Sequence, residues 1–347
     1  MMSRGASRGL WAAVVPCLLL APSAPAEESG ARRIELATQA AQKWSYVLPA
    51  ERWTSVGDEI PIAHDGQSGF QVEVRGPLKI AVDCDGDGRP ETIVAGVKGF
   101  ATLRGKDADG EPFTYPVRFA NDGSGWKFSA GGFARGSVGG QPVVVIDQNN
   151  NGRYDDYGAD ALVIGSGEAA SFLSKVIHVG GELYHFDIDP AGRHASVTPF
   201  EGPTGVIDAE KAFKSFGNLV AAVVTCDSMS FNVADARGGM KVPAGTYKLA
   251  AGYAVRGTES VWIKSGRMPS IEVESGGKVE MAWGGPVVAE ADVTRSGETI
   301  VVSANVKFYG QAGEEYHTFK PNAKSPKIIV VEKSTRRELT SGRFGGC

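Results

Sequence analysis

The chain has 347 residues, of which 42% are hydrophobic, and its 36 basic and 40 acidic side chains give a formal net charge of −4. A mildly acidic chain without clustered Lys and Arg lacks the electrostatic footprint of a nucleic-acid-binding protein. The sequence has no basic amphipathic stretch of the kind that binds a membrane surface. The length predicts two domains, or one domain with an elaborated partner.

The first predicted element is a secretory leader over residues 1–26. Arg4 and Arg8 precede an apolar run, and the small-residue motif APA ends at Ala26. This three-part pattern is typical of a cleaved signal peptide, and the apolar run is too short to span a bilayer. We therefore expect an exported protein (periplasmic, on the cell surface or secreted) that begins near Glu27 and has no membrane span after cleavage.

Short strands dominate the pattern after the leader. Runs such as FQVEVRG, QPVVVID, LYHFDID and KIIVVEK alternate in polarity or are β-branched, and Gly, Asn, Asp and Pro separate them. Closely spaced short strands with turn residues between them predict a mainly β protein built of sandwiches or meanders. Only residues 33–44 and 207–216 have the pattern of short helices, and neither carries strong caps.

A first acidic loop follows the predicted strand LKIAVD. Asp83, Asp85 and Asp87 occupy alternate positions, a glycine then allows a sharp reversal, and Glu91 follows. Alternate oxygens on such a turn converge on one point, where the backbone carbonyl of Arg89 joins them. Hard oxygen ligands of this number and charge suit Ca²⁺, whereas the sulfur and imidazole ligands that Zn²⁺ prefers are not arranged there.

A second loop, IDQNNNGRYDD, repeats this spacing. Its candidate ligands, in chain order, are Asp147, Asn149, Asn151, the carbonyl of Arg153, Asp155 and the additional acid Asp156. Asp, Asn and Gly also make good turns without an ion, which is the alternative interpretation for each loop. Two loops of matched spacing, each after an apolar strand, favour calcium, because carboxylates crowded into one turn otherwise repel one another.

Neither loop is an EF-hand. That motif needs a bidentate Glu at position 12 between two helices, but Val94 and Gly158 stand there and both loops are flanked by predicted strands. The loops instead resemble the D-x-[DN]-x-[DN]-G-x-x-[DE] calcium loop that joins two strands in integrin-type propeller repeats and related secreted bacterial modules. The resemblance implies the same ligands, but two loops are too few for a full propeller.

The Pro- and Gly-rich stretch TPFEGPTG predicts a domain boundary near residues 200–205. We expect a β-rich, calcium-loop-bearing β-hairpin domain over 27–203 and a β-sandwich domain over 204–347. In the latter, KVPAGTYKLAAGYAV places a turn before a strand with Tyr247 and Leu249 on one face. This stretch resembles the strand entry of secreted immunoglobulin-like modules. The whole chain resembles exported bacterial β-rich proteins that pair such loops with a C-terminal immunoglobulin-like sandwich.

Other candidates for chemistry have simpler interpretations. His178, His185 and His194 lie near Asp187 and Asp189, but strand alternation beside a DPAGR turn favours surface hairpin residues. No H-E-x-x-H helix, G-x-S-x-G elbow or glycine-rich phosphate loop occurs in the sequence.

Three cysteines follow the leader, which is too few for a disulfide scaffold. Cys226 and Cys347 are the pair that we expect to form a disulfide. Cys84 lies inside the first acidic loop and has no nearby His to activate it as a nucleophile.

These features predict a secreted, calcium-stabilised structural or ligand-binding protein in which the ion locks two hairpins. Its expected partners are calcium and a carbohydrate or an extracellular protein, with no nucleic acid. No catalytic residue is assigned, so the sequence leans against an enzyme. The alternative is a secreted hydrolase that acts on polysaccharide and holds calcium as a structural ion.

Overall fold

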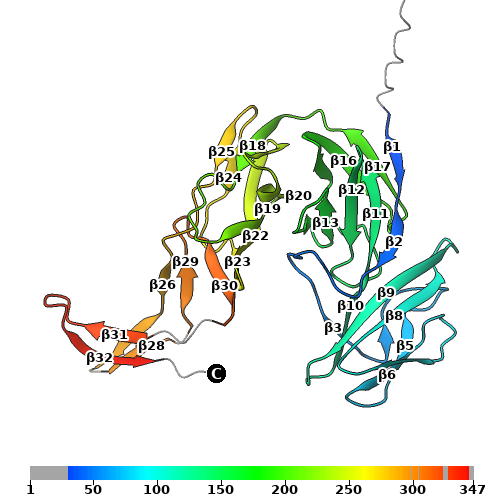
Figure 1. Cartoon of the computed structure of the whole chain (residues 1–347), viewed down its shortest axis with the longest axis horizontal. Coiled ribbons are helices and arrows are strands. Elements are labelled where there is room, and N and C mark those ends of the chain that lie inside the picture. Colours follow the sequence, from blue (N-terminus) through cyan, green and yellow to red (C-terminus); the bar gives the residue numbers. More distant parts are fainter. Residues whose placement is uncertain (1–29, 298, 304, 323–326, 344–347) are drawn as a thin grey trace, which may run out of the picture. The chain divides into compact units, whose positions relative to one another are not determined.

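The protein is mainly β, as the strand pattern predicts, with many antiparallel sheets and one short 3-10 helix, η1, among the described residues (Figure 1). The computed structural model describes most of the chain: residues 30–297, 299–303, 305–322 and 327–343. The expected leader at 1–26 lies outside this part. No helix in the described ranges is long and apolar enough to cross a membrane.

Two four-stranded sheets share one hydrophobic cluster. Their strand orders are β4-β5-β6-β7 and β3-β10-β9-β8. The bounds are β3 Thr54–Ser55, β4 Glu59–Ile60, β5 Phe70–Val74, β6 Lys79–Val82, β7 Thr92–Ala95, β8 Lys98–Lys106, β9 Pro112–Asn121 and β10 Trp126–Ala130. Phe70, Ile80 and Leu103 are fully buried in the cluster, since alternate residues of a strand point to one face. Each such side chain stabilises the fold by about 1.5–3 kcal/mol.

Two further sheets share a second cluster, with the orders β14-β13-β12-β11-β2 and β1-β17-β16-β15. Val143, Phe186 and Val197 are buried there. The bounds are β1 Arg32–Glu35, β2 Ala37–Ala40, β11 Gly132–Val138, β12 Gln141–Ile146, β13 Ala161–Ile164, β14 Ser171–Phe172, β15 Val176–Val179, β16 Glu182–Ile188 and β17 His194–Pro199.

The two helices expected from the sequence are wrong. Residues 33–44 contribute β1, which pairs with β17, and β2, which pairs with β11. The stretch 207–216 begins with the end of β18 and continues as turns, without a helix. Short uncapped segments are marginal as helices in water. Pairing with a sheet that is already packed therefore overrides the weak helical pattern.

The C-terminal part holds a three-stranded sheet, β21-β18-β25, and a larger sheet ordered β20-β19-β22-β23-β30-β29-β26, on which β24 pairs with β22. Two hairpins, β27–β28 and β31–β32, complete it. The bounds are β18 Thr204–Asp208, β19 Asn218–Cys226, β20 Met229–Asn232, η1 Val233–Asp235, β21 Met240–Pro243, β22 Gly245–Arg256, β23 Glu259–Lys264, β24 Ile271–Val273, β25 Lys278–Glu280, β26 Val288–Glu290, β27 Val293–Ser296, β28 Thr299–Val302, β29 Lys307–Tyr309, β30 Glu315–Lys320, β31 Lys327–Val331 and β32 Glu338–Arg343.

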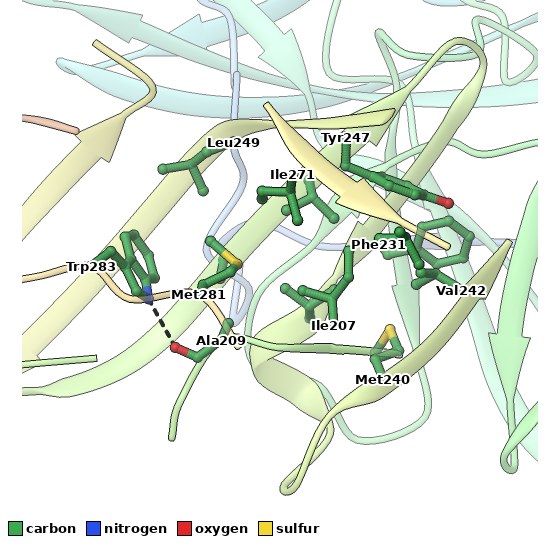
Figure 2. Close-up of a cluster of buried hydrophobic side chains, with 14 of the residues drawn as sticks. Ile207, Ala209, Phe231, Met240, Val242, Tyr247, Leu249, Ile271, Met281 and Trp283 are labelled. Atoms are coloured by element: carbon green, nitrogen blue, oxygen red, sulfur yellow. Dashed lines mark hydrogen bonds between the residues drawn. The ribbon is translucent and has the colours of Figure 1, made fainter. Parts of the chain in front are cut away.

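A third hydrophobic cluster lies between these two sheets (Figure 2). Tyr247 and Leu249 are both buried in it, as the alternation of β22 predicts. The Tyr247 hydroxyl donates a hydrogen bond to the carbonyl of Pro243 at 2.8 Å. The indole N–H of Trp283 donates to the carbonyl of Ala209, also at 2.8 Å. Each buried aromatic ring therefore has its polar atom satisfied, which avoids the cost of an unpaired donor.

Candidate metal centre

The first acidic loop joins β6 to β7, which pair in antiparallel register up to Val82 and Thr92. Asp83 begins the loop and is fully buried. Its Oδ1 accepts the N–H of Gly86 at 2.8 Å, and its Oδ2 accepts the N–H of Gly88 at 2.9 Å. Both glycines have a positive φ, of 77° and 82°, which few residues other than glycine adopt. One buried carboxylate thus organises the whole turn.

Four acidic side chains of this loop converge on one another. One carboxylate oxygen from each of Asp83, Asp85, Asp87 and Glu91 lies within 4.8 Å of the other three. Asp83 is buried, and the other three are exposed. Among the described residues, no Lys, Arg or His forms an ion pair with any of the four. The arrangement could therefore hold a metal ion, as the spacing in the sequence predicts.

The remaining sequence candidate in this loop is the carbonyl of Arg89. Its backbone N–H donates to Oδ1 of Asp87 at 2.8 Å, which continues the chain of turn hydrogen bonds. That its carbonyl completes the ligand shell stays a prediction.

A buried histidine packs against the first loop. His64 is 2% exposed and stacks on Phe70, with ring centroids 3.6 Å apart. A Cβ atom at Gly86 would lie 2.7 Å from its Cδ2 atom, so glycine is needed there for space as well as for φ. Sequence reasoning assigned no role to His64, because its contact with the loop depends on tertiary packing.

The second loop joins β12 to β13 and repeats the turn of the first. Asp147 is fully buried, like Asp83. Its Oδ1 accepts the N–H of Asn150 at 2.6 Å, and its Oδ2 accepts the N–H of Gly152 at 2.7 Å. Asn150 and Gly152 have φ values of 68° and 81°, close to those at the same positions of the first loop. The two loops, which share the same spacing of Asp, Asn and Gly, therefore also share the same backbone conformation.

The acids later in the second loop separate into two groups. Oδ2 of Asp156 accepts the side-chain amides of Asn149 at 2.9 Å and Asn151 at 2.6 Å. Asp155 instead pairs with the Arg153 guanidinium through hydrogen bonds of 3.0 and 2.8 Å. The structure thus gathers Asn149, Asn151 and Asp156, while Asp155 already has a positive partner.

Asp160 belongs to the second site although sequence reasoning did not single it out. It is fully buried, and its Oδ2 accepts the N–H of Asp156 at 3.2 Å. Burial, together with the charges of Asp147, Asp156 and Asp155, raises the pKa of Asp160 to about 9. Its sequence signal is that it directly precedes the strand ALVI, as Glu91 directly precedes the strand after the first loop.

Two tyrosines line the buried side of the second loop. The hydroxyl of Tyr115 donates to Oδ2 of Asp147 at 2.8 Å. Burial raises the pKa of Asp147 to about 6, although this hydrogen bond and those from the loop backbone lower it. Burial, with the charges of Asp147 and Asp160, also raises the pKa of Tyr154. Acidic groups thus lie near one another here in a buried environment.

The histidine-rich hairpin forms surface ion pairs. Asp187 pairs with Lys175 at 2.6 Å, and the two ring nitrogens of His194 lie 3.0 Å from carboxylate oxygens of Asp189 and Glu35. These contacts fit the surface interpretation that the strand alternation favours.

Within the described part of the chain, Cys84 and Cys226 form no disulfide, and Cys347, the expected partner of Cys226, lies outside it. Burial raises the pKa of the Cys84 thiol, which opposes a nucleophilic role.

Comparison of the chain with protein-family profiles, with curated proteins and with solved structures found no match.

Proposed function

We propose that the protein is an exported structural or ligand-binding β protein whose sheets are stabilised by calcium held in its acidic loops. The observation that carries the proposal is the convergence of four carboxylate oxygens in the first loop. Two like unit charges 4 Å apart repel by about 1 kcal/mol in water and about 4 kcal/mol near a protein surface. A divalent cation at their centre turns this repulsion into attraction.

The ligand chemistry favours calcium over other metals. All four side chains offer hard oxygen, and no thiolate or imidazole joins them, which disfavours zinc. Calcium takes six to eight oxygens at about 2.3–2.6 Å, so its opposing ligands lie up to about 5 Å apart. Magnesium holds its ligands at about 2.0–2.1 Å, in a tighter octahedron. Four oxygens that lie within 4.8 Å of one another can surround the larger ion.

The C-terminal sheets support an immunoglobulin-like assignment for residues 204–347. The bond from the Tyr247 hydroxyl to the Pro243 carbonyl ties a strand back to the turn just upstream of it. Such a tyrosine corner is typical of immunoglobulin-like sandwiches, in which a buried Tyr bonds to backbone a few residues earlier. Modules of this kind commonly serve extracellular binding, which agrees with the leader pattern at residues 1–26.

A polar cavity of about 700 Å³ supports a ligand-binding role. Gln141, Asn232, Asp235 and Arg237 contribute to its lining. This volume lies within the usual range for small-molecule sites, and amide and charged groups suit hydroxyl-rich ligands such as carbohydrates. In this proposal the calcium loops keep the sheets in place and take no part in a reaction.

Calcium-dependent thermal unfolding tests the proposal on the mature chain 27–347. Calcium that binds only the folded state adds RT ln(1 + [Ca²⁺]/Kd), about 2.7 kcal/mol at a hundredfold excess over Kd. Millimolar calcium should therefore raise the melting temperature above its value in excess chelator. Asp87→Asn should reduce this shift, whereas the matched change Asp109→Asn, at an exposed turn of another hairpin, should preserve it. A wild-type melting curve that is the same with calcium and with chelator would overturn the proposal.

A further inference from the structure

The strand register identifies equivalent acids in the two loops. In the first, the ladder ends at the pair Val82–Thr92, so the next facing positions are Asp83 and Glu91. In the second, it ends at the pair Ile146–Ala161, so the next facing positions are Asp147 and Asp160. Asp160 therefore holds in the second loop the place that Glu91 holds in the first. The greater length of the second loop hides this equivalence from the sequence motif.

Two buried polar atoms near Asp147 lack a partner among the described residues. They are Oδ1 of Asp160 and the hydroxyl oxygen of Tyr154, whose residues are 0% and 4% exposed. Buried polar atoms are nearly always satisfied, because an unsatisfied one costs about 1–3 kcal/mol. Tyr154 is not an acid, so it points to a ligand independently of the carboxylates.

The charges of this site also lack compensation from the protein. Asp155 is paired with Arg153, but no ion pair of the described chain includes Asp147, Asp156 or Asp160. Asp147 and Asp160 are both buried, and a buried carboxylate without a counter-charge costs far more than a buried neutral polar group. A bound cation supplies that charge beside the free lone pairs of Asp160, and a water in its shell would give the Tyr154 hydroxyl a partner.

We propose that the second loop is a divalent-cation site with a ligand set that differs from the one its motif predicts. Its ligands are Asp147, Asp156 and Asp160 together with the amide oxygens of Asn149 and Asn151. The two amides now donate to Asp156, and rotation about the terminal torsion of each presents its oxygen instead. Asp155 is not a ligand. The inference rests on the proposed calcium function but concerns a different site.

The site fixes a junction between two sheets. Next to Asp147, the side chain of Asn150 accepts the N–H of Ala130 at 2.9 Å and donates to the Arg52 carbonyl and the Thr54 hydroxyl, each at 3.1 Å. These partners lie on or beside β3 and β10, whereas the loop extends from β12 and β13. A cation that fixes the loop therefore also holds it against the neighbouring sheet.

Calcium titration calorimetry on the mature chain 27–347 tests the ligand set. Wild type should bind two calcium ions, and Asp160→Asn should bind one. The matched change Asp155→Asn should still bind two. Asp156→Asn provides a second test should Asp160→Asn fail to fold, and it should also bind one. Circular dichroism before titration verifies the fold of each variant.

A variant of the first loop distinguishes the proposed calcium function from the proposed ligand set of the second loop. Asp87→Asn should lose one ion and keep the other, so a double change with Asp160→Asn should bind none. A wild-type chain that binds no calcium would refute the proposed function itself. A chain that loses an ion in Asp87→Asn and in Asp155→Asn, but not in Asp160→Asn or Asp156→Asn, would overturn the present inference alone.

Discussion

Two glycines of the first loop share a backbone conformation but differ in their surroundings. Gly86 and Gly88 have φ values of 77° and 82°. A Cβ atom at Gly86 would meet the His64 ring at 2.7 Å, whereas a Cβ at Gly88 would have no heavy atom within 4 Å. The pair therefore separates the cost of backbone strain from the cost of a steric clash.

We predict that Gly88→Ala lowers the free energy of unfolding by about 1–2 kcal/mol, the penalty of an L-residue in the left-handed region. Gly86→Ala should cost about 1–3 kcal/mol more, because the buried imidazole has to move. Urea denaturation in excess chelator measures both without a contribution from calcium. Equal losses in the two variants would show that His64 yields at no cost.

At the scale of elements, Arg193 ties the turn between β16 and β17 to the hairpin loop between β8 and β9. Its guanidinium lies 2.7 Å from the carboxylate of Asp107 and donates to the carbonyls of Glu111 and Pro112 at 3.2 and 3.1 Å. Burial would raise the pKa of Asp107, but hydrogen bonds from the Glu111 N–H and the Arg193 guanidinium outweigh it and lower the pKa.

Removal of this link should destabilise the protein. Arg193→Ala is expected to lower the free energy of unfolding by about 2 kcal/mol, as for hydrogen bonds to a charged group. The control Arg256→Ala, which breaks an exposed pair within one hairpin, should change it by less than about 1 kcal/mol.

The effect of Arg193→Ala should also depend on pH. The pKa of Asp107 is lower in the folded state, so the stability from its charge is complete above the ordinary value of 3.8 and is lost as the pH falls through the folded value. Denaturant unfolding of both proteins at neutral pH and at about pH 3 checks this. A difference that stays constant between the two pH values would argue that the bonds to the two carbonyls carry the whole effect.

The sequence predicts the strands and the first acidic loop because both depend on local patterns. The proposed ligand role of Asp160 and the strands within 33–44 could not be predicted, because they depend on pairing between distant strands. The alternation of Asp83, Asp85 and Asp87 is a local property of one turn, so the sequence contains it in full. Asp160 escaped notice because its place opposite Asp147 depends on the register of two strands across a long loop. The stretch 33–44 read as a helix because its partner strands lie far along the chain.

At the scale of the whole molecule, the sequence pattern of residues 1–26 predicts where the protein is found. We predict that the mature protein begins near Glu27 and lies outside the cytoplasm, because the charged start, apolar run and APA motif form a cleavable signal. Intact-mass measurement and N-terminal sequencing of the protein from its native host test this. Recovery of the uncleaved chain from the cytoplasm would contradict it.

The pairing of β1 determines when this strand can fold during synthesis. Arg32 pairs with Val197 and Glu35 with His194, so β1 pairs with a strand that is made much later. β2 pairs with β11, at Gly132–Val138, which is also made later. Because synthesis proceeds from the N-terminus, the pairing of β1 with β17 cannot be complete until residue 197 has been made. The segment 54–130, by contrast, contains all the partners of its own strands, β3 to β10. It can therefore close before β1 finds its partner strand.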